Sequence, residues 1–148
     1  MVRLFNLLAL GLVVLVGGIS IAGAQSLPDL KGTWTGTSKT IVSGLAPHHP
    51  ATVAAKPAGP NRLTEVKFTV KVDGQQGNRI WGTITSPSTA DPFVGVISTD
   101  GKRLHMVLQR GGGFLEGTVL SPDSIEIVYL EHAGGIALAA TNLWTRQK

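Results

Sequence analysis

The sequence predicts an all-β protein, an eight-stranded antiparallel up-and-down barrel, with a β-sandwich as the alternative. Beyond residue 25 no segment has helical periodicity, and apolar residues recur at every second position instead. Turn-forming Gly, Pro, Asp and Asn residues separate the apolar segments at short intervals. Such short connections cannot cross a sheet, so successive strands pair antiparallel, and closure into a barrel leaves no unpaired edge.

The clearest strand is VKFTVKV, residues 66–72, in which Val and Phe alternate with Lys and Thr. One face of this strand is therefore buried and the other is solvated. Turns are predicted at DGQQGN, STADP, TDGK, RGGG, SPDS and HAGG, of which Asp100-Gly101 is the strongest hairpin signal. In chain order, the predicted strands are 30–42, 64–73, 78–86, 92–98, 103–109, 113–120, 124–131 and 136–146.

The first 24 residues have the pattern of a secretory signal peptide. Arg3 precedes a long apolar run, and Ala22-Gly23-Ala24 fits the small-residue rule for cleavage before Gln25. The same run is long enough for an uncleaved membrane anchor, which stays open as an alternative. Cleavage leaves one domain, residues 25–148, in the periplasm or outside the cell, without stable membrane insertion.

Charge and cysteine content exclude several kinds of covalent link and partner. The chain has no cysteine, so neither a disulfide nor a lipid anchor on cysteine is available. Its net charge is +4, but the basic residues are scattered and do not interleave with aromatic residues. Nucleic-acid binding needs a concentrated basic surface, so nucleic acid is not expected as a partner.

A long Pro- and Ala-rich loop, SGLAPHHPATVAAKPAGPNR (residues 43–62), joins the first two strands. A loop of this length in a compact domain is typically functional, disordered or a misassigned element. We interpret it as a semi-rigid lid. His48 and His49 are adjacent, and neighbouring side chains of an extended chain point in opposite directions. We therefore expect a rim pair and predict neither a metal site nor a cofactor.

Two short motifs resemble those of known barrels. Gly32-Thr33-Trp34 resembles the G-x-W motif of the lipocalins and the GTW opening of the avidin/streptavidin family, and Trp144-Thr145-Arg146 resembles their last strand. The resemblance implies that Trp34 closes one end of an eight-stranded barrel and that Arg146 packs over it. Gly36 stands where the avidins have a biotin-binding asparagine, so biotin binding is not expected.

The meander topology indicates which end of the barrel is open. It places the connections 43–62, 87–91, 110–112 and 132–135 at the end opposite Trp34. Tyr129 shares the inner face of its strand with Ile125 and Ile127, and its hydroxyl then needs a partner or a ligand. The predicted ligand-binding residues are His48, His49, Arg110, Tyr129, Glu131 and His132, with Asp91 also at this mouth.

The alternation also separates the interior from the outer wall. Trp81 and His105 fall on the outer face, and FVGVI (residues 93–97) is apolar on both faces, which suggests a homo-oligomer. The glycine runs 111–113 and 134–135 fit turns, because no helix follows them to form a phosphate site. The predicted interior comprises Val66, Phe68, Val70, Val72, Ile80, Ile84, Leu104, Met106, Leu108, Leu115, Val119, Ile125 and Ile127.

The sequence thus predicts an exported barrel that binds an apolar or amphipathic small molecule under the 43–62 loop. Two alternatives stay open. One is a structural or oligomerisation module that acts through its outer wall, with a filled lumen and no enclosed ligand. The other is an isomerase- or cyclase-like enzyme that uses Tyr129, Glu131 and His132. No nucleophile elbow or other catalytic motif is present, so no catalytic residue is predicted.

Overall fold

The computed structural model describes residues 26–44, 56–58, 61–133 and 135–148, and every element in them is a strand. None of these described residues forms a helix long and apolar enough to cross a membrane. The strands are β1 (Gly32–Gly44), β2 (Lys56–Ala58), β3 (Asn61–Gln76), β4 (Arg79–Thr85), β5 (Ala90–Ile97), β6 (Arg103–Leu108), β7 (Phe114–Ser121), β8 (Ser124–Ala133) and β9 (Ile136–Arg146).

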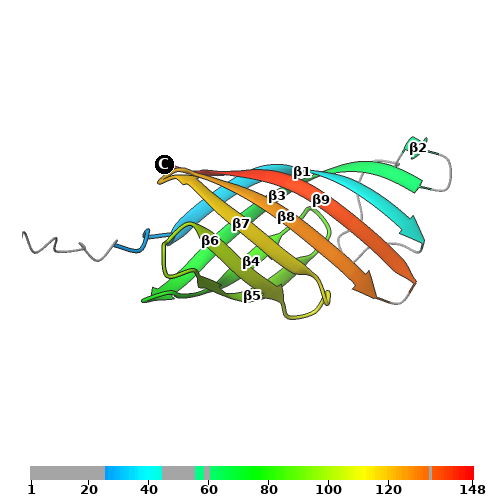
Figure 1. Ribbon diagram of the computed structural model, residues 1–148. Coiled ribbons are helices and arrows are strands. Elements are labelled where there is room, and N and C mark those ends of the chain that lie inside the picture. The colour runs from blue at the N-terminus through cyan, green and yellow to red at the C-terminus, as the bar shows by residue number, and fades with distance from the viewer. Residues whose placement is uncertain (1–25, 45–55, 59–60, 134) are drawn as a thin grey trace, which may run out of the picture.

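The strands form one closed antiparallel barrel (Figure 1). Each strand from β3 to β8 pairs with the next along the chain, β1 pairs with β3, and β9 pairs back with β1. The short β2 adds to the outer end of β3 alone. The predicted eight-stranded up-and-down barrel, β1 and β3–β9, is confirmed, and the sandwich alternative is wrong because β1–β9 pairing closes the sheet.

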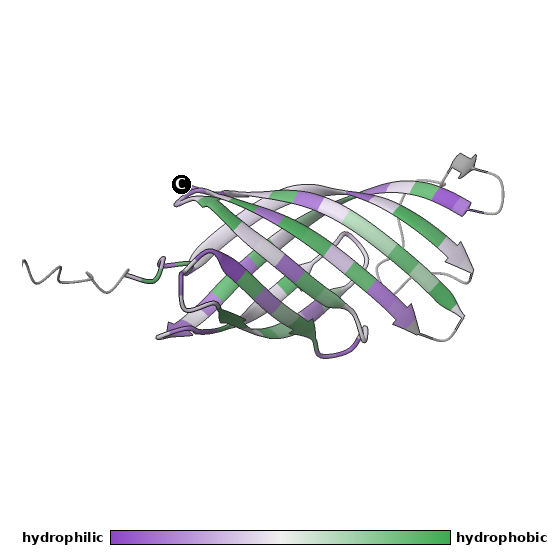
Figure 2. Ribbon diagram, viewed as in Figure 1, coloured by the Kyte–Doolittle hydropathy of each residue, from purple (hydrophilic) through white to green (hydrophobic). Residues whose placement is uncertain are grey.

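The alternation of apolar and polar residues determines which side chains enter the barrel. Apolar and polar segments alternate along the strands in Figure 2. Every residue of the predicted interior is buried or packs against the core, Phe68 and Val119 being the partly buried ones among those in the main cluster. Trp81 is 46% exposed and His105 is exposed, as predicted for the outer wall.

One end of the barrel is closed by Trp34. Its side chain is fully buried, its indole Nε1–H donates to the carbonyl of Leu30 at 3.0 Å, and the Arg146 guanidinium lies 4.2 Å from the ring centroid. Arg146 also donates to three backbone carbonyls, those of Asp29, Lys31 and Pro122. The expected packing of Arg146 over Trp34 is therefore confirmed.

At the opposite end the wall is uneven. The strands β1, β3, β8 and β9 have 13, 16, 10 and 11 residues, whereas β4 to β7 have 6 to 8. The long strands extend beyond the short ones on the right of Figure 1. One half of the wall thus projects past the other at the end away from Trp34.

Two connections differ from the sequence-based expectation. The strand predicted to end at residue 73 continues to Gln76, because a bulge between Val72 and Gly74 keeps β3 paired with β4. The turn is therefore at residues 77–78. The segment 43–62 is partly strand: β1 continues to Gly44, Lys56–Ala58 form β2, and β3 begins at Asn61. The predicted lid with His48 and His49, and the predicted signal segment 1–24, lie outside the described residues.

Candidate ligand-binding lumen

The barrel interior consists of two apolar clusters stacked along its axis. The larger cluster extends from Trp34 toward the opposite end of the barrel and includes Trp144. The smaller cluster comprises Val42, Leu138 and Ala140 near the open end. Tyr129 packs against both clusters. Its ring therefore lies at the boundary between the larger cluster and the smaller one.

A cavity of about 40 Å³ lies beneath Tyr129 in the middle of the barrel. A single water needs roughly 10–15 Å³ of such space, whereas pockets for drug-sized ligands measure about 300–1,000 Å³. The lumen is thus mostly filled by side chains, with room for a small chemical group. The residues lining the cavity are Ser38, Phe68, Ile84, Leu108, Leu115, Ile127, Tyr129, Ala140, Asn142 and Trp144.

Asn142 lines this cavity and carries an unsatisfied acceptor. It lies between Ala140 and Trp144 on the inner face of β9, and its Oδ1 is buried without a hydrogen-bond partner in the part of the chain that the structure describes. Leaving a buried acceptor unpaired costs about 1–3 kcal/mol. A hydrogen-bond donor that enters the cavity, whether a water molecule or a ligand group, would satisfy this oxygen.

Gly36 on β1 makes room for this carboxamide. A Cβ at position 36 would overlap Asn142 Oδ1 and would stand 2.5 Å from the carbonyl oxygen of Leu143. The β1–β9 ladder is interrupted at the same height, since its pairs stop at Thr35 and resume at Lys39. The absence of a side chain at Gly36 thus lets the Asn142 side chain lie against β1.

The Tyr129 hydroxyl donates a hydrogen bond of 2.8 Å to Oε2 of Glu131. Burial raises the pKa of Tyr129 well above its ordinary value, and the hydrogen bond and negative charge of Glu131 raise it further. The ring lies on Gly113, where any Cβ would overlap it. The predicted inward orientation of Tyr129 is confirmed, and its hydroxyl proton is committed to Glu131.

Two carboxylates are buried at the end of the lumen away from Trp34, which is called the upper end below. Glu131 is 5% exposed and Asp91 is fully buried. Oδ1 and Oδ2 of Asp91 accept hydrogen bonds from the backbone N–H groups of Arg110 and Gly111, at 3.1 and 3.2 Å, which holds the turn between β6 and β7. These two acids are the only charged side chains among the buried residues that the structure describes. The charges buried at this end, among the described residues, are therefore both negative.

The structure brings together some of the predicted site residues. Tyr129 and Glu131 are hydrogen-bonded, whereas His132 is exposed because it alternates with Glu131 along β8. The Arg110 side chain is exposed too, and its contribution is the backbone bond to Asp91. The three residues of the enzyme alternative, Tyr129, Glu131 and His132, thus do not converge on one cavity. Within the described ranges, no three His, Asp or Glu side chains group as metal ligands.

Sequence reasoning missed Asn142, which is the unusual feature of the cavity. A signal for it exists: Leu138, Ala140, Asn142 and Trp144 alternate along β9, and Asn142 is the single polar residue of these four. The orphaned oxygen itself could not be predicted, because it depends on the local gap between β1 and β9.

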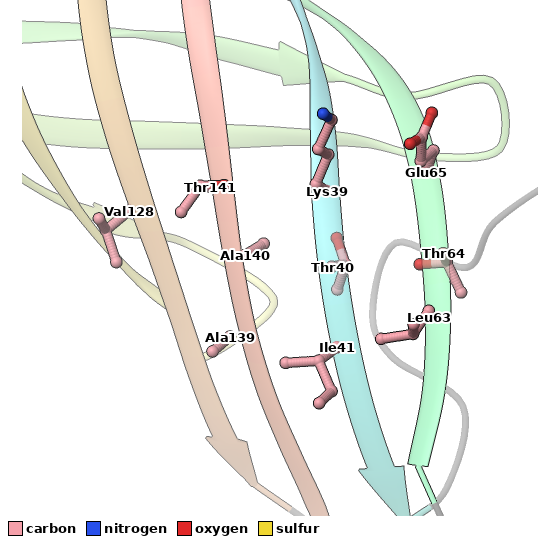
Figure 3. Close-up of a pocket in the computed structure, with 10 residues that line it drawn as sticks. All are labelled: Lys39, Thr40, Ile41, Leu63, Thr64, Glu65, Val128, Ala139, Ala140 and Thr141. Atoms are coloured by element: carbon pink, nitrogen blue, oxygen red, sulfur yellow. The ribbon is translucent and has the colours of Figure 1, made fainter. Parts of the chain in front are cut away.

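The outer wall carries a continuous apolar belt. Neighbouring outward residues pair across successive strands, and the larger ones are 40–60% exposed. Figure 3 shows part of it, a groove of about 590 Å³ in which Ala139 and Thr141 lie between Val128 and Ile41. A second groove of about 660 Å³ lies over β5 to β8. In pairing order, the belt consists of Trp81, Val94, Val107, Phe114, Leu130, Ala139, Ile41 and Leu63.

Neither a protein-family model nor a curated protein matches this chain. Among solved structures, the barrel is similar to a de novo designed fluorescence-activating β-barrel, with a TM-score of 0.40 and 19% identity over 84% of this chain and 96% of that one. It is also similar to the S-type phycobiliprotein lyase CPES from Guillardia theta, with a TM-score of 0.34 and 12% identity over 80% of this chain and 89% of that one.

Proposed function

We propose that this protein binds a small apolar or amphipathic molecule in its lumen, with a hydrogen-bond donor of the ligand against Asn142. The observation that carries the proposal is the buried Oδ1 of Asn142, which has no partner among the described residues and belongs to a side chain that lines an internal cavity. A ligand N–H or O–H that reaches this oxygen removes a penalty of about 1–3 kcal/mol that the barrel bears without it.

The cavity also constrains the shape of the ligand. Its volume of about 40 Å³ admits a group of a few heavy atoms, lined mostly by apolar side chains. The rest of a larger ligand has to lie toward the open end, past the ring of Tyr129. Tyr129 thus separates the deep cavity from the upper lumen, and a ligand that spans both displaces its ring.

An NMR titration tests the lumen site. The probes are hexan-1-ol and its donor-free analogue hexane, and the signal is the side-chain carboxamide of Asn142. The proposal expects hexan-1-ol to shift that signal and to bind at least tenfold more tightly than hexane, because only the alcohol satisfies Oδ1. Asn142→Leu should abolish the preference.

The matched control is Asn78→Leu, because the Asn78 side chain is bonded to the carbonyl of Ile97 in an exposed turn. This variant should keep the preference for hexan-1-ol. Equal binding of alcohol and hexane by the wild-type protein, or a shift of Asn142 in neither titration, would overturn the lumen site.

We also propose that the protein is exported to the periplasm or secreted. The basis is the Arg3-led apolar run with the Ala22-Gly23-Ala24 cleavage pattern. Expression of the full chain in a bacterium followed by mass measurement of the periplasmic fraction tests this. A species that begins at Gln25 supports export, and recovery of only the full-length chain with the cells contradicts it.

A second candidate function is self-association through the outer belt. Its exposed apolar side chains favour burial, and the adjacent outward row contains both signs of charge, with Lys39 opposite Glu65 in the strand register. Two copies can therefore face each other without net repulsion, so the occupant is a second copy of this chain. Light scattering of the wild type and a Trp81→Ser, Phe114→Ser variant measures this. A dimer that becomes a monomer supports it, and a wild-type monomer at high concentration refutes it.

A further inference from the structure

We propose that the lumen ligand is a cation, an amphipathic amine whose ammonium group lies against Glu131. This inference rests on the proposed lumen function and adds the charge class of the ligand. It starts from Glu131, a carboxylate that is 5% exposed at the end away from Trp34, in a barrel where no lysine, arginine or histidine is buried among the described residues.

Glu131 is the carboxylate with the weaker support. Asp91 accepts two backbone N–H bonds, whereas the hydrogen bond recorded for Glu131 comes from the Tyr129 hydroxyl. The ion pairs of the described side chains join Lys31 to Asp29, Lys71 to Asp73 and Arg146 to Asp123, none of which involves Glu131. A buried charge without a counter-charge is costly, and a ligand cation supplies that counter-charge.

Two oxygen atoms of the lumen also suit a ligand that donates hydrogen bonds. The Tyr129 hydroxyl uses its proton in the bond to Glu131, and Asn142 presents an oxygen, so both offer acceptor sites to a ligand. A ligand carboxylate at this end would lie beside the buried Glu131 carboxylate, and the like charges would repel. Arg146 cannot compensate, because it lies over Trp34 at the closed end. The lumen therefore selects donors and positive charge and rejects fatty-acid-like anions.

The strand register gives the ligand its length. Asn142 on β9 pairs with Ile127, which lies four residues along β8 from Glu131. At about 3.3 Å per residue, the two acceptor positions are separated by roughly 13 Å along the strand. The full ligand is therefore about this long, whereas a six-carbon amine covers only part of the span, with its ammonium group against Glu131 and its apolar tail directed toward the cavity beside Asn142.

The test uses three probes with the same six-carbon chain, hexylamine, hexan-1-ol and hexanoate, titrated into the wild-type protein by calorimetry at neutral pH. We expect hexylamine to bind about tenfold more tightly than hexan-1-ol, which a charge-assisted hydrogen bond supports, and hexanoate to bind most weakly. Equal affinities of amine and alcohol, or tightest binding of hexanoate, would overturn the cation inference while the lumen site stands. Binding of none of the three would overturn the lumen site itself.

The variant Glu131→Gln keeps an acceptor for Tyr129 and removes the charge. We expect it to lose about tenfold in hexylamine affinity, the worth of one charge-assisted bond, and to keep its affinity for hexan-1-ol, a split that general unfolding would not produce. Glu116→Gln is the matched control, since Glu116 is exposed on the outer wall, and it should behave as wild type. An unchanged amine preference in Glu131→Gln refutes the role of Glu131, and the wild-type comparison stands even if this variant does not fold.

Discussion

The hydroxyl of Tyr129 and the carboxylate of Glu131 form a 2.8 Å hydrogen bond between two residues that share the inner face of β8. The bond places a buried acid and the only tyrosine of the chain at the boundary between the two clusters of the lumen. It fixes the ring over the deep cavity, and it leaves the lumen with oxygen acceptors. The proposed route of the ligand and its proposed charge class both rest on this pair.

Alkaline titration should show a tyrosine that does not ionise in the folded state. Burial and Glu131 raise the pKa of Tyr129, so the folded protein holds the phenol proton above the ordinary pKa of about 10. The resulting stabilisation is fully present below that value and is lost as the pH rises further, because the unfolded chain ionises first. Absorbance near 295 nm measures this residue alone, and tyrosinate should form together with unfolding.

The variant Glu131→Gln should lower the pKa of Tyr129 toward its ordinary value, since the negative charge is gone. Glu126→Gln, on the outer face of the same strand, should leave the titration unchanged. Tyrosinate that forms near its ordinary pKa of about 10 in the folded wild-type protein would contradict the bond to Glu131.

Asn142→Leu should stabilise the barrel measured without added ligand. The substitution replaces a buried, unpaired carbonyl with an apolar group of similar size, and the expected gain is about 1 kcal/mol in the free energy of unfolding. Urea denaturation measures the change. A loss of more than about 1 kcal/mol would mean that the carboxamide is already satisfied within the protein, and the case for a ligand donor would fall.

Gly113→Ala should displace the ring of Tyr129. The new Cβ overlaps the ring, and overpacking of this kind costs about 1–3 kcal/mol. Gly112→Ala is the control: that position has open space, so its cost comes only from the positive φ of 64°. Only Gly113→Ala should change the Tyr129 titration, and equal effects of both variants would argue against ring packing on Gly113.

Arg146→Ala should destabilise the closed end by about 2–3 kcal/mol, because its guanidinium covers the Trp34 ring and donates to three backbone carbonyls. Arg146→Lys should restore only part of this, because an ammonium group cannot reach all three carbonyls from one fixed plane. Thermal unfolding checks both, with exposed Arg103→Ala as the control. Full rescue by lysine would show that the positive charge alone matters.

The sequence predicted most of the fold because each strand alternates clearly and each turn is short. Residues 66–72 show the pattern, and Trp34 with Arg146 indicated the closed end. The bulge between Val72 and Gly74 could not be predicted. The pairing of β3 with β4 continues on both sides of it, and that pairing depends on contacts between the strands and not on the local sequence. For the site, the alternation of residues along β8 predicted that Tyr129 and Glu131 lie on its inner face. The same alternation places His132 on the outer face. Asn142 was missed because its lone oxygen depends on how β1 and β9 separate.

Native mass spectrometry of the protein purified from the cells that naturally produce it tests the lumen site most directly. We expect the wild-type protein to carry a non-covalent mass that matches a small amine and is released on unfolding. The Asn142→Leu variant should lack that mass, and Asn78→Leu should retain it. A wild-type protein that carries no such mass, or carries one that Asn142→Leu retains in full, would contradict binding at Asn142.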